Sequence, residues 1–143
     1  MATDDPYDLA RFRAAQDAHG AYRDALAELR GGRKTSHWMW FVFPQLAGLG
    51  RSPTAVFFAI GSIDEARAYL ADPVLGPRLV EVARAAADAP ATSVAELLGE
   101  VDATKLRSSM TLFTRAAPEE EAFRRVLERW FGGAQDPATV SLL

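Results

Sequence analysis

Residues 31–50 of this chain read GGRKTSHWMWFVFPQLAGLG, and the rest of the sequence is organised around them. Residues 38–43 form a run of six apolar side chains that is too short to cross a bilayer and too bulky to remain in water. We expect this run at the centre of a hydrophobic core. Glycines precede it and Pro44 follows it, so polar groups enter and leave the core at its two ends. These ends are candidate walls of a binding site.

The aromatic residues of this run, among them Trp38 and Trp40, have two interpretations. Large aromatic side chains most often fill volume in a core, and each one can be explained in this way when taken singly. They can also form the wall of a ligand site. In either case, a buried indole N–H group needs a hydrogen-bond acceptor.

The composition is that of an ordinary globular domain. The chain has 143 residues, of which 49% are hydrophobic and 24% are charged, which suffices for one core without disulfides. It has no cysteine, and its net charge of −3 offers no basic surface for nucleic acid. Residues 1–8 are acidic and polar and lack the pattern of a signal peptide, which predicts a cytoplasmic protein. We expect neither nucleic acid nor a membrane as a partner.

One helix is predicted on each side of Gly31-Gly32, the glycine pair that ends the first of them. Apolar residues recur at three- and four-residue spacings over residues 7–30, which predicts one long amphipathic helix with a kink or break at Gly20. The run over residues 37–43 has β-propensity, but no partner strand is found elsewhere in the sequence. A short helix that Pro44 ends is therefore favoured.

The apolar stretch over residues 55–60 is predicted to form a second buried element. Ser52-Pro53 precedes it with a helix cap and a proline suited to the first helical position. We therefore expect a short helix that lies in the core beside the aromatic run.

Further helix starts are predicted in the second half of the chain. They are the capping boxes Ser62–Glu65 and Ser93–Glu96, then Asp72-Pro73 with an interruption at Gly76-Pro77, Asp102 for a helix through Arg115, Pro118, and Asp136-Pro137. The patterns predict an all-α fold of seven or eight helices in one compact domain over residues 1–143. We expect residues 1–6 to be flexible and residues 134–143 to form a tail.

Several motifs that carry familiar chemistry are missing from the sequence. The two histidines, His19 and His37, are far apart and no paired metal ligands occur, so we expect no metal site. Residues 32–35 resemble the end of a phosphate-binding loop but lack its Gly-Lys pair and its upstream glycine. Residues 48–50 lack the third glycine of a dinucleotide fingerprint. We expect no cofactor, and the sequence assigns no catalytic residue.

The helix predicted from Asp102 carries the first candidate binding residues. At about 100° per residue, its apolar stripe of Leu106, Met110 and Phe113 faces the core, and Lys105 and Ser109 lie on the flank. The common explanation is that Lys105 extends its ammonium to water while Ser108 and Ser109 permit close helix packing. The alternative is that lysine and hydroxyl groups face a cleft, where they act as a nucleophilic pair only if burial lowers the lysine pKa.

Polar residues at the two ends of the aromatic run are the other candidates. His37 lies beside the tryptophans, where it can exchange a proton with a stacked ligand or simply cap a helix. Gln45, Arg51 and Ser52 precede a predicted helix whose N-terminus favours negative charge. Loop closure and capping explain these three residues as well.

Three segments of the sequence resemble a known protein family. They read HWMWFVFPQLxGLGxS over residues 37–52, EAxxYL and PVLGxRL within residues 65–79, and KLxSSMTLF over residues 105–113. They are similar to a bacterial family of domains of unknown function that is often labelled calpastatin. The resemblance covers nearly the whole chain and implies a mainly helical fold, but no activity, cofactor or catalytic residue. We do not adopt the label, because it denotes disordered inhibitory segments and this chain is a folded domain.

We expect the chain to bind a small anionic metabolite, and to turn it over if it is an enzyme, in a cleft between residues 37–45 and the helix over residues 102–115. The candidate ligand-binding residues are His37, Trp38, Trp40, Gln45, Arg51, Ser52, Lys105, Ser108 and Ser109. We expect one pocket to gather His37, Trp38, Gln45, Arg51, Lys105 and Ser109, with a local preference for phosphate or carboxylate. The alternative is a non-catalytic module whose helical surface contacts another protein.

Overall fold

The computed structural model describes residues 5–143, which contain ten α-helices and one 3-10 turn. They are α1 (Ala10–Asp17), η1 (Ala18–Gly20), α2 (Ala21–Arg30), α3 (Met39–Val42), α4 (Pro53–Phe57), α5 (Ile63–Ala71), α6 (Leu75–Ala87), α7 (Val94–Leu98), α8 (Glu100–Ala116), α9 (Glu121–Phe131) and α10 (Pro137–Leu142). No strand forms within these residues, so the predicted all-α class is confirmed. Most of the segment predicted to be flexible, residues 1–4, lies outside the described residues.

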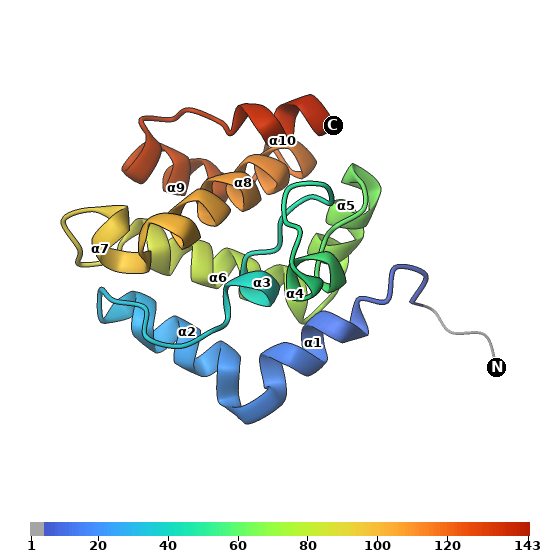
Figure 1. The fold of residues 1–143 in the computed structure, drawn as a ribbon, viewed down its shortest axis with the longest axis horizontal. Helices are drawn as coiled ribbons and strands as arrows, with labels where there is room; N and C mark the ends of the chain where they lie inside the picture. The colour runs from blue at the N-terminus through green and yellow to red at the C-terminus, as the bar shows by residue number, and fades with distance from the viewer. Residues whose placement is uncertain (1–4) are drawn as a thin grey trace.

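Helices α6 and α8 run through the middle of the molecule, and the other helices pack around them (Figure 1). Helices α1 and α2 lie on one side of this pair, whereas α9 and α10 lie on the other. The predicted apolar stripe of α8 is confirmed, because its three residues Leu106, Met110 and Phe113 are fully buried. No helix among residues 5–143 combines the length and apolar character needed to cross a membrane.

The aromatic run enters the core as predicted. It forms the short helix α3, which ends before Pro44, and Trp38, Met39, Val42 and Phe43 are each about 1% exposed. Trp40 is half-buried and therefore reaches the surface. The predicted helix and the predicted burial of most of this run are both confirmed.

The prediction that residues 55–60 lie at the centre of the core is wrong. Val56 and Phe57 are 63% and 57% exposed, and only Ile60 of this stretch is fully buried. The cause is a parallel bridge between Leu46 and Ile60, which draws Ile60 inward. Because Ile60 N–H donates to Gln45 O at 2.9 Å, the chain enters the core there and α4 stays outside.

The break predicted at Gly20 separates two helices. His19 and Gly20 have φ angles of 54° and 68°, in the left-handed region that cannot continue an α-helix. Helix α2 therefore turns away from α1 and runs alongside α6 (Figure 1). This turn brings the end of α2 close to the entry of the aromatic run.

Several helix starts differ from their predicted positions. Helix α8 begins directly after Gly99, so Asp102 lies in its first turn and does not cap it. Gly76-Pro77 does not interrupt α6, because both residues lie in the first turn, where N–H groups have no partner within the helix. Helix α9 begins at Glu121, three residues after Pro118. The caps predicted at Ser52, Ser62, Ser93 and Asp136 are confirmed.

The Glu28 carboxylate on α2 fixes the approach to the aromatic run. It accepts hydrogen bonds from Thr35 N–H at 2.7 Å, Ser36 N–H at 2.9 Å, Ser36 Oγ at 2.6 Å and the Trp38 indole Nε1 at 3.0 Å. Burial by itself raises the pKa of Glu28, but the hydrogen bonds from Ser36, Thr35 and Trp38 outweigh it and hold the pKa at about 2. The acceptor that the buried indole needs is therefore a charged one.

The Arg11 guanidinium on α1 holds the loop that follows α4. It donates to Phe57 O at 2.8 Å and Ala59 O at 2.9 Å, and it pairs with Glu65 Oε2 at 3.0 Å. Only 11% of the Arg11 side chain and 9% of the Glu65 side chain are exposed. Glu65 also accepts from Gly61 N–H at 3.0 Å, so one buried ion pair joins α1, α5 and this loop.

Replacing Glu28 by Gln is expected to destabilise the fold in a pH-dependent way. Hydrogen bonds to charged groups contribute about 1.5–3 kcal/mol each, and we expect a loss of about 2 kcal/mol in the free energy of unfolding at pH 7. Folding lowers the pKa of Glu28, so its contribution is complete above the ordinary value of 4.5 and is lost as pH falls toward about 2. Urea unfolding of both proteins should give a smaller difference at pH 3 than at pH 7. An equal difference contradicts this assignment, and Glu128→Gln is the control at an exposed position.

Replacing Arg11 by Ala is expected to cost about 3 kcal/mol in the free energy of unfolding, because removing one partner leaves a buried charge unpaired. Arg11→Lys should recover only part of this loss, since an ammonium cannot spread its donors as a guanidinium does. Chemical denaturation at pH 7 measures both values. Arg13→Lys is the matched control, because this side chain is 33% exposed and the change should cost less than about 1 kcal/mol. Full recovery by Arg11→Lys would show that charge alone matters.

Candidate functional site

Two lysine ammonium groups meet at one carboxylate. Lys34 Nζ lies 3.0 Å from Asp102 Oδ2, and Lys105 Nζ lies 3.5 Å from Asp102 Oδ1. The three side chains are 10%, 21% and 18% exposed for Lys34, Lys105 and Asp102. These groups are partly shielded from water but remain reachable at the surface.

Each ammonium also lies over the face of a tryptophan ring. Lys34 Nζ is 5.2 Å from the centre of the Trp38 ring, and Lys105 Nζ is 4.8 Å from the centre of the Trp40 ring. The electron-rich face of an indole attracts a cation at such distances. We call these five residues, Lys34, Trp38, Trp40, Asp102 and Lys105, the paired-lysine site.

Three separate elements position the paired-lysine site. Lys34 lies in the loop after α2, where its N–H donates to Leu97 O of α7 at 2.7 Å. Trp40 lies on α3, while Asp102 and Lys105 occupy successive turns of α8. The site therefore forms only when the loop, α3 and α8 have packed together.

The lysines of this site are the only two in the chain. The sequence has 16 basic residues, and the remaining 14 are arginines. An ammonium is a compact charge with three donors, so two of them can share one carboxylate and still keep donors for a further group. The site thus holds two positive charges against the one negative charge of Asp102.

The structure brings together only some of the residues predicted for the site. Trp38, Trp40 and Lys105 belong to the paired-lysine site, and His37 is exposed one residue before Trp38. Ligand binding by any of these residues stays a prediction. Lys34 and Asp102 are absent from the predicted set, because Lys34 falls in the incomplete phosphate-loop pattern and Asp102 is interpreted as a helix cap. The spacing of Asp102 and Lys105 by three residues on one helix was the available signal.

The other predicted residues lie outside the paired-lysine site. Gln45 O accepts from Ile60 N–H at 2.9 Å, and Ser52 caps α4, one residue after the exposed Arg51. Ser108 Oγ lies 3.1 Å from both Thr104 O and Asp136 Oδ2, which share its single hydroxyl proton, and so joins α8 to the start of α10. Ser109 Oγ is buried without a hydrogen-bond partner among the described residues.

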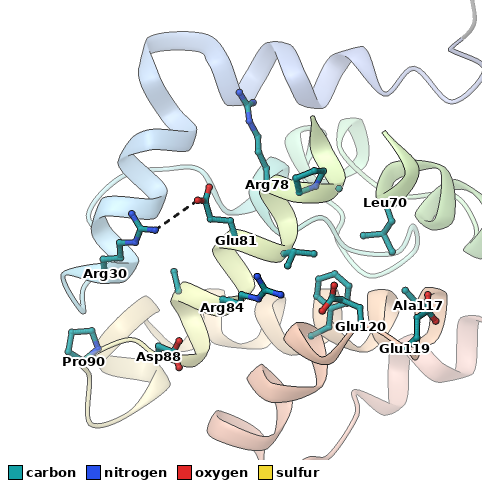
Figure 2. Close-up of a pocket in the computed structure, with 15 residues that line it drawn as sticks. Arg30, Leu70, Arg78, Glu81, Arg84, Asp88, Pro90, Ala117, Glu119 and Glu120 are labelled. Carbon is teal, nitrogen blue, oxygen red and sulfur yellow. Dashed lines mark ion pairs between the residues drawn. The ribbon is translucent and has the colours of Figure 1, made fainter. Parts of the chain in front are cut away.

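An open groove lies away from the paired-lysine site, between α2, α6 and α9 (Figure 2). Its volume is about 1030 Å³, and none of the residues predicted for the site lines it. Its walls combine apolar side chains such as Leu70 and Val80 with charged ones such as Arg30, Glu81, Arg84 and Glu119. Arg30 and Glu81 face each other across one end at 4.0 Å.

A polar network supports the α2 side of this groove. The Tyr22 hydroxyl on α2 bonds to the Glu81 carboxylate and to Arg78 O, and the Arg78 guanidinium lies 4.8 Å from the centre of the Tyr22 ring. Arg78 also pairs with Asp17 at 2.9 Å. Burial, followed by the hydrogen bond to Glu81, raises the pKa of Tyr22, so this hydroxyl stays protonated.

A second and smaller pocket has a concave surface and a volume of about 500 Å³, and it lies at the C-terminal end of the chain. It is lined by Leu46, Gly61, Ser62, Ile63, Arg115, Leu142 and Leu143. None of the predicted binding residues lines this surface either. Over residues 5–143, no group of three or more histidine or acidic side chains is arranged to hold a metal ion.

Comparison with known proteins gives a close structural match. The crystal structure of the conserved hypothetical protein Rv1873 from Mycobacterium tuberculosis is similar, with 50% sequence identity and a TM-score of 0.93. The match covers 97% of this chain and 98% of that one. None of the curated proteins matches this chain.

The family resemblance inferred from the three sequence segments is also confirmed. Residues 6–143 match the model of a family described as "Protein of unknown function (DUF1810)". The match spans far more than half of the chain, including all three segments and the whole paired-lysine site. The chain therefore belongs to the family of proteins of unknown function DUF1810.

Proposed function

We propose that this protein binds a small anionic metabolite at the paired-lysine site. The observation that carries the proposal is the meeting of both lysines of the chain at one carboxylate. Two ammonium groups against one carboxylate leave a surplus positive charge, and the partial burial of the three side chains makes that charge more effective than it is in water. A cytoplasmic location, as the sequence predicts, forms part of the proposal.

The surroundings of the two ammonium groups support the same proposal. Each ammonium has three donors and directs one of its interactions at Asp102, which leaves donors for the oxygens of a ligand. The half-buried Trp40 ring beside Lys105 offers an apolar surface for the rest of the ligand. The proposal concerns binding, and no residue of the site is given a chemical step.

The second candidate function is that of a protein-interaction module. The groove between α2, α6 and α9 supports it, because an open groove of about 1030 Å³ with mixed apolar and charged walls suits a peptide segment better than a small metabolite. The surplus positive charge of the paired-lysine site favours the ligand proposal. Neither lysine lines the groove, so an interaction module that uses the groove would make no use of this charge.

Lys105→Ala is expected to abolish the stabilisation that anionic metabolites give to the native protein. A ligand that binds only the native state raises Tm with the logarithm of its concentration, so a thermal-shift screen of carboxylates and phosphates detects it. The unliganded variant should stay within about 1 kcal/mol of the natural protein, because Lys105 and Asp102 form a partly exposed pair three residues apart.

Arg33→Ala is the matched control for this screen. It removes the same charge at an exposed position beside Lys34, outside the paired-lysine site, and should keep the thermal shift. Equal loss of the shift in both variants would mean that overall charge, and not this site, attracts the ligand. If no anion in the screen shifts Tm, the ligand proposal fails and the interaction module is the remaining candidate.

A further inference from the structure

We infer that Asp102 restricts the paired-lysine site to ligands with one negative charge, which assigns carboxylates rather than phosphate dianions as its ligand class. The inference rests on the proposed function, because it concerns the ligand of the same site. It makes Asp102 a specificity-determining residue.

The charges around the site support a single-charge ligand. Lys34 and Lys105 supply two positive charges, and Asp102 removes one of them, so one negative charge on the ligand neutralises the group. Because Asp102 halves the net positive charge that the two lysines offer, the attraction of a phosphate dianion no longer outweighs the hydration that it loses, which rises with the square of the ligand charge.

The geometry of the carboxylate explains why Asp102 remains in place when a ligand binds. Its two oxygens each contact a different ammonium, Oδ2 at 3.0 Å from Lys34 and Oδ1 at 3.5 Å from Lys105. A ligand oxygen that bridges the two ammonium groups therefore sits beside Asp102 and does not displace it. An arginine in place of either lysine would occupy both oxygens with its fork and leave no such bridge.

The test compares two ligands that share a phenyl ring and differ in charge. Benzoate carries one negative charge at pH 8, and phenyl phosphate carries two, because the second pKa of a phosphate monoester is about 6. Protein labelled with ¹³C only in lysine reports binding cleanly, since the signals come from Lys34 and Lys105 alone. We expect the Kd of benzoate to be at least about tenfold lower than that of phenyl phosphate at pH 8.

The natural protein alone supplies a second test. Phenyl phosphate should bind more tightly at pH 5, where it carries one charge, than at pH 8, where it carries two. This comparison needs no variant, so it remains valid if a substitution disturbs folding. Benzoate keeps one charge throughout this range and serves as the control for changes in the protein.

Asp102→Asn should reverse the preference. The variant keeps the shape of the side chain but leaves two uncompensated ammonium groups, so phenyl phosphate should bind at pH 8 at least about tenfold more tightly than to the natural protein. Lysine signals that respond to neither ligand would overturn the proposed function itself. Equal or tighter binding of phenyl phosphate by the natural protein at pH 8 would overturn the inference about Asp102 while leaving the binding function intact.

Discussion

The hydrogen bond that the Trp38 indole donates to the Glu28 carboxylate fixes how the aromatic run packs against α2. A buried indole N–H must have an acceptor, and the acceptor here is a charged group on α2 that also binds the backbone of the preceding loop. Because the left-handed turn at His19 and Gly20 directs α2 along α6, Glu28 reaches this position. The aromatic run then enters the core in one fixed position relative to α2.

The paired-lysine site depends on this position of the aromatic run. Once Trp38 is fixed, Lys34 lies over its ring, and α3 places Trp40 beside Lys105 of α8. Helix α8 contributes a buried stripe on one face, and Asp102 and Lys105 lie beside it. The core and the candidate site therefore share the same elements, so a change that loosens the loop before α3 affects both.

Interactions within a few residues were predictable from the sequence, whereas contacts between distant segments were not. The caps at Ser52, Ser62, Ser93 and Asp136 and the stripe of α8 depend on local spacing, and they were predicted. The exposure of Phe57 depends on a bridge between Leu46 and Ile60, which no local pattern reveals. The meeting of Lys34 with Asp102 likewise depends on how the loop packs against α8, so only the α8 half of the site, represented by Lys105, was predicted.

The scarcity of lysine has a consequence for covalent chemistry. Apart from the chain terminus, Lys34 and Lys105 are the only primary amines, and 14 arginines carry the rest of the positive charge. Acylation of either side chain, whether by a reagent or by an enzyme, removes one positive charge from the paired-lysine site and leaves every other side chain unchanged. Acylation of side-chain amines in this protein is thus confined to the place where its surplus charge lies.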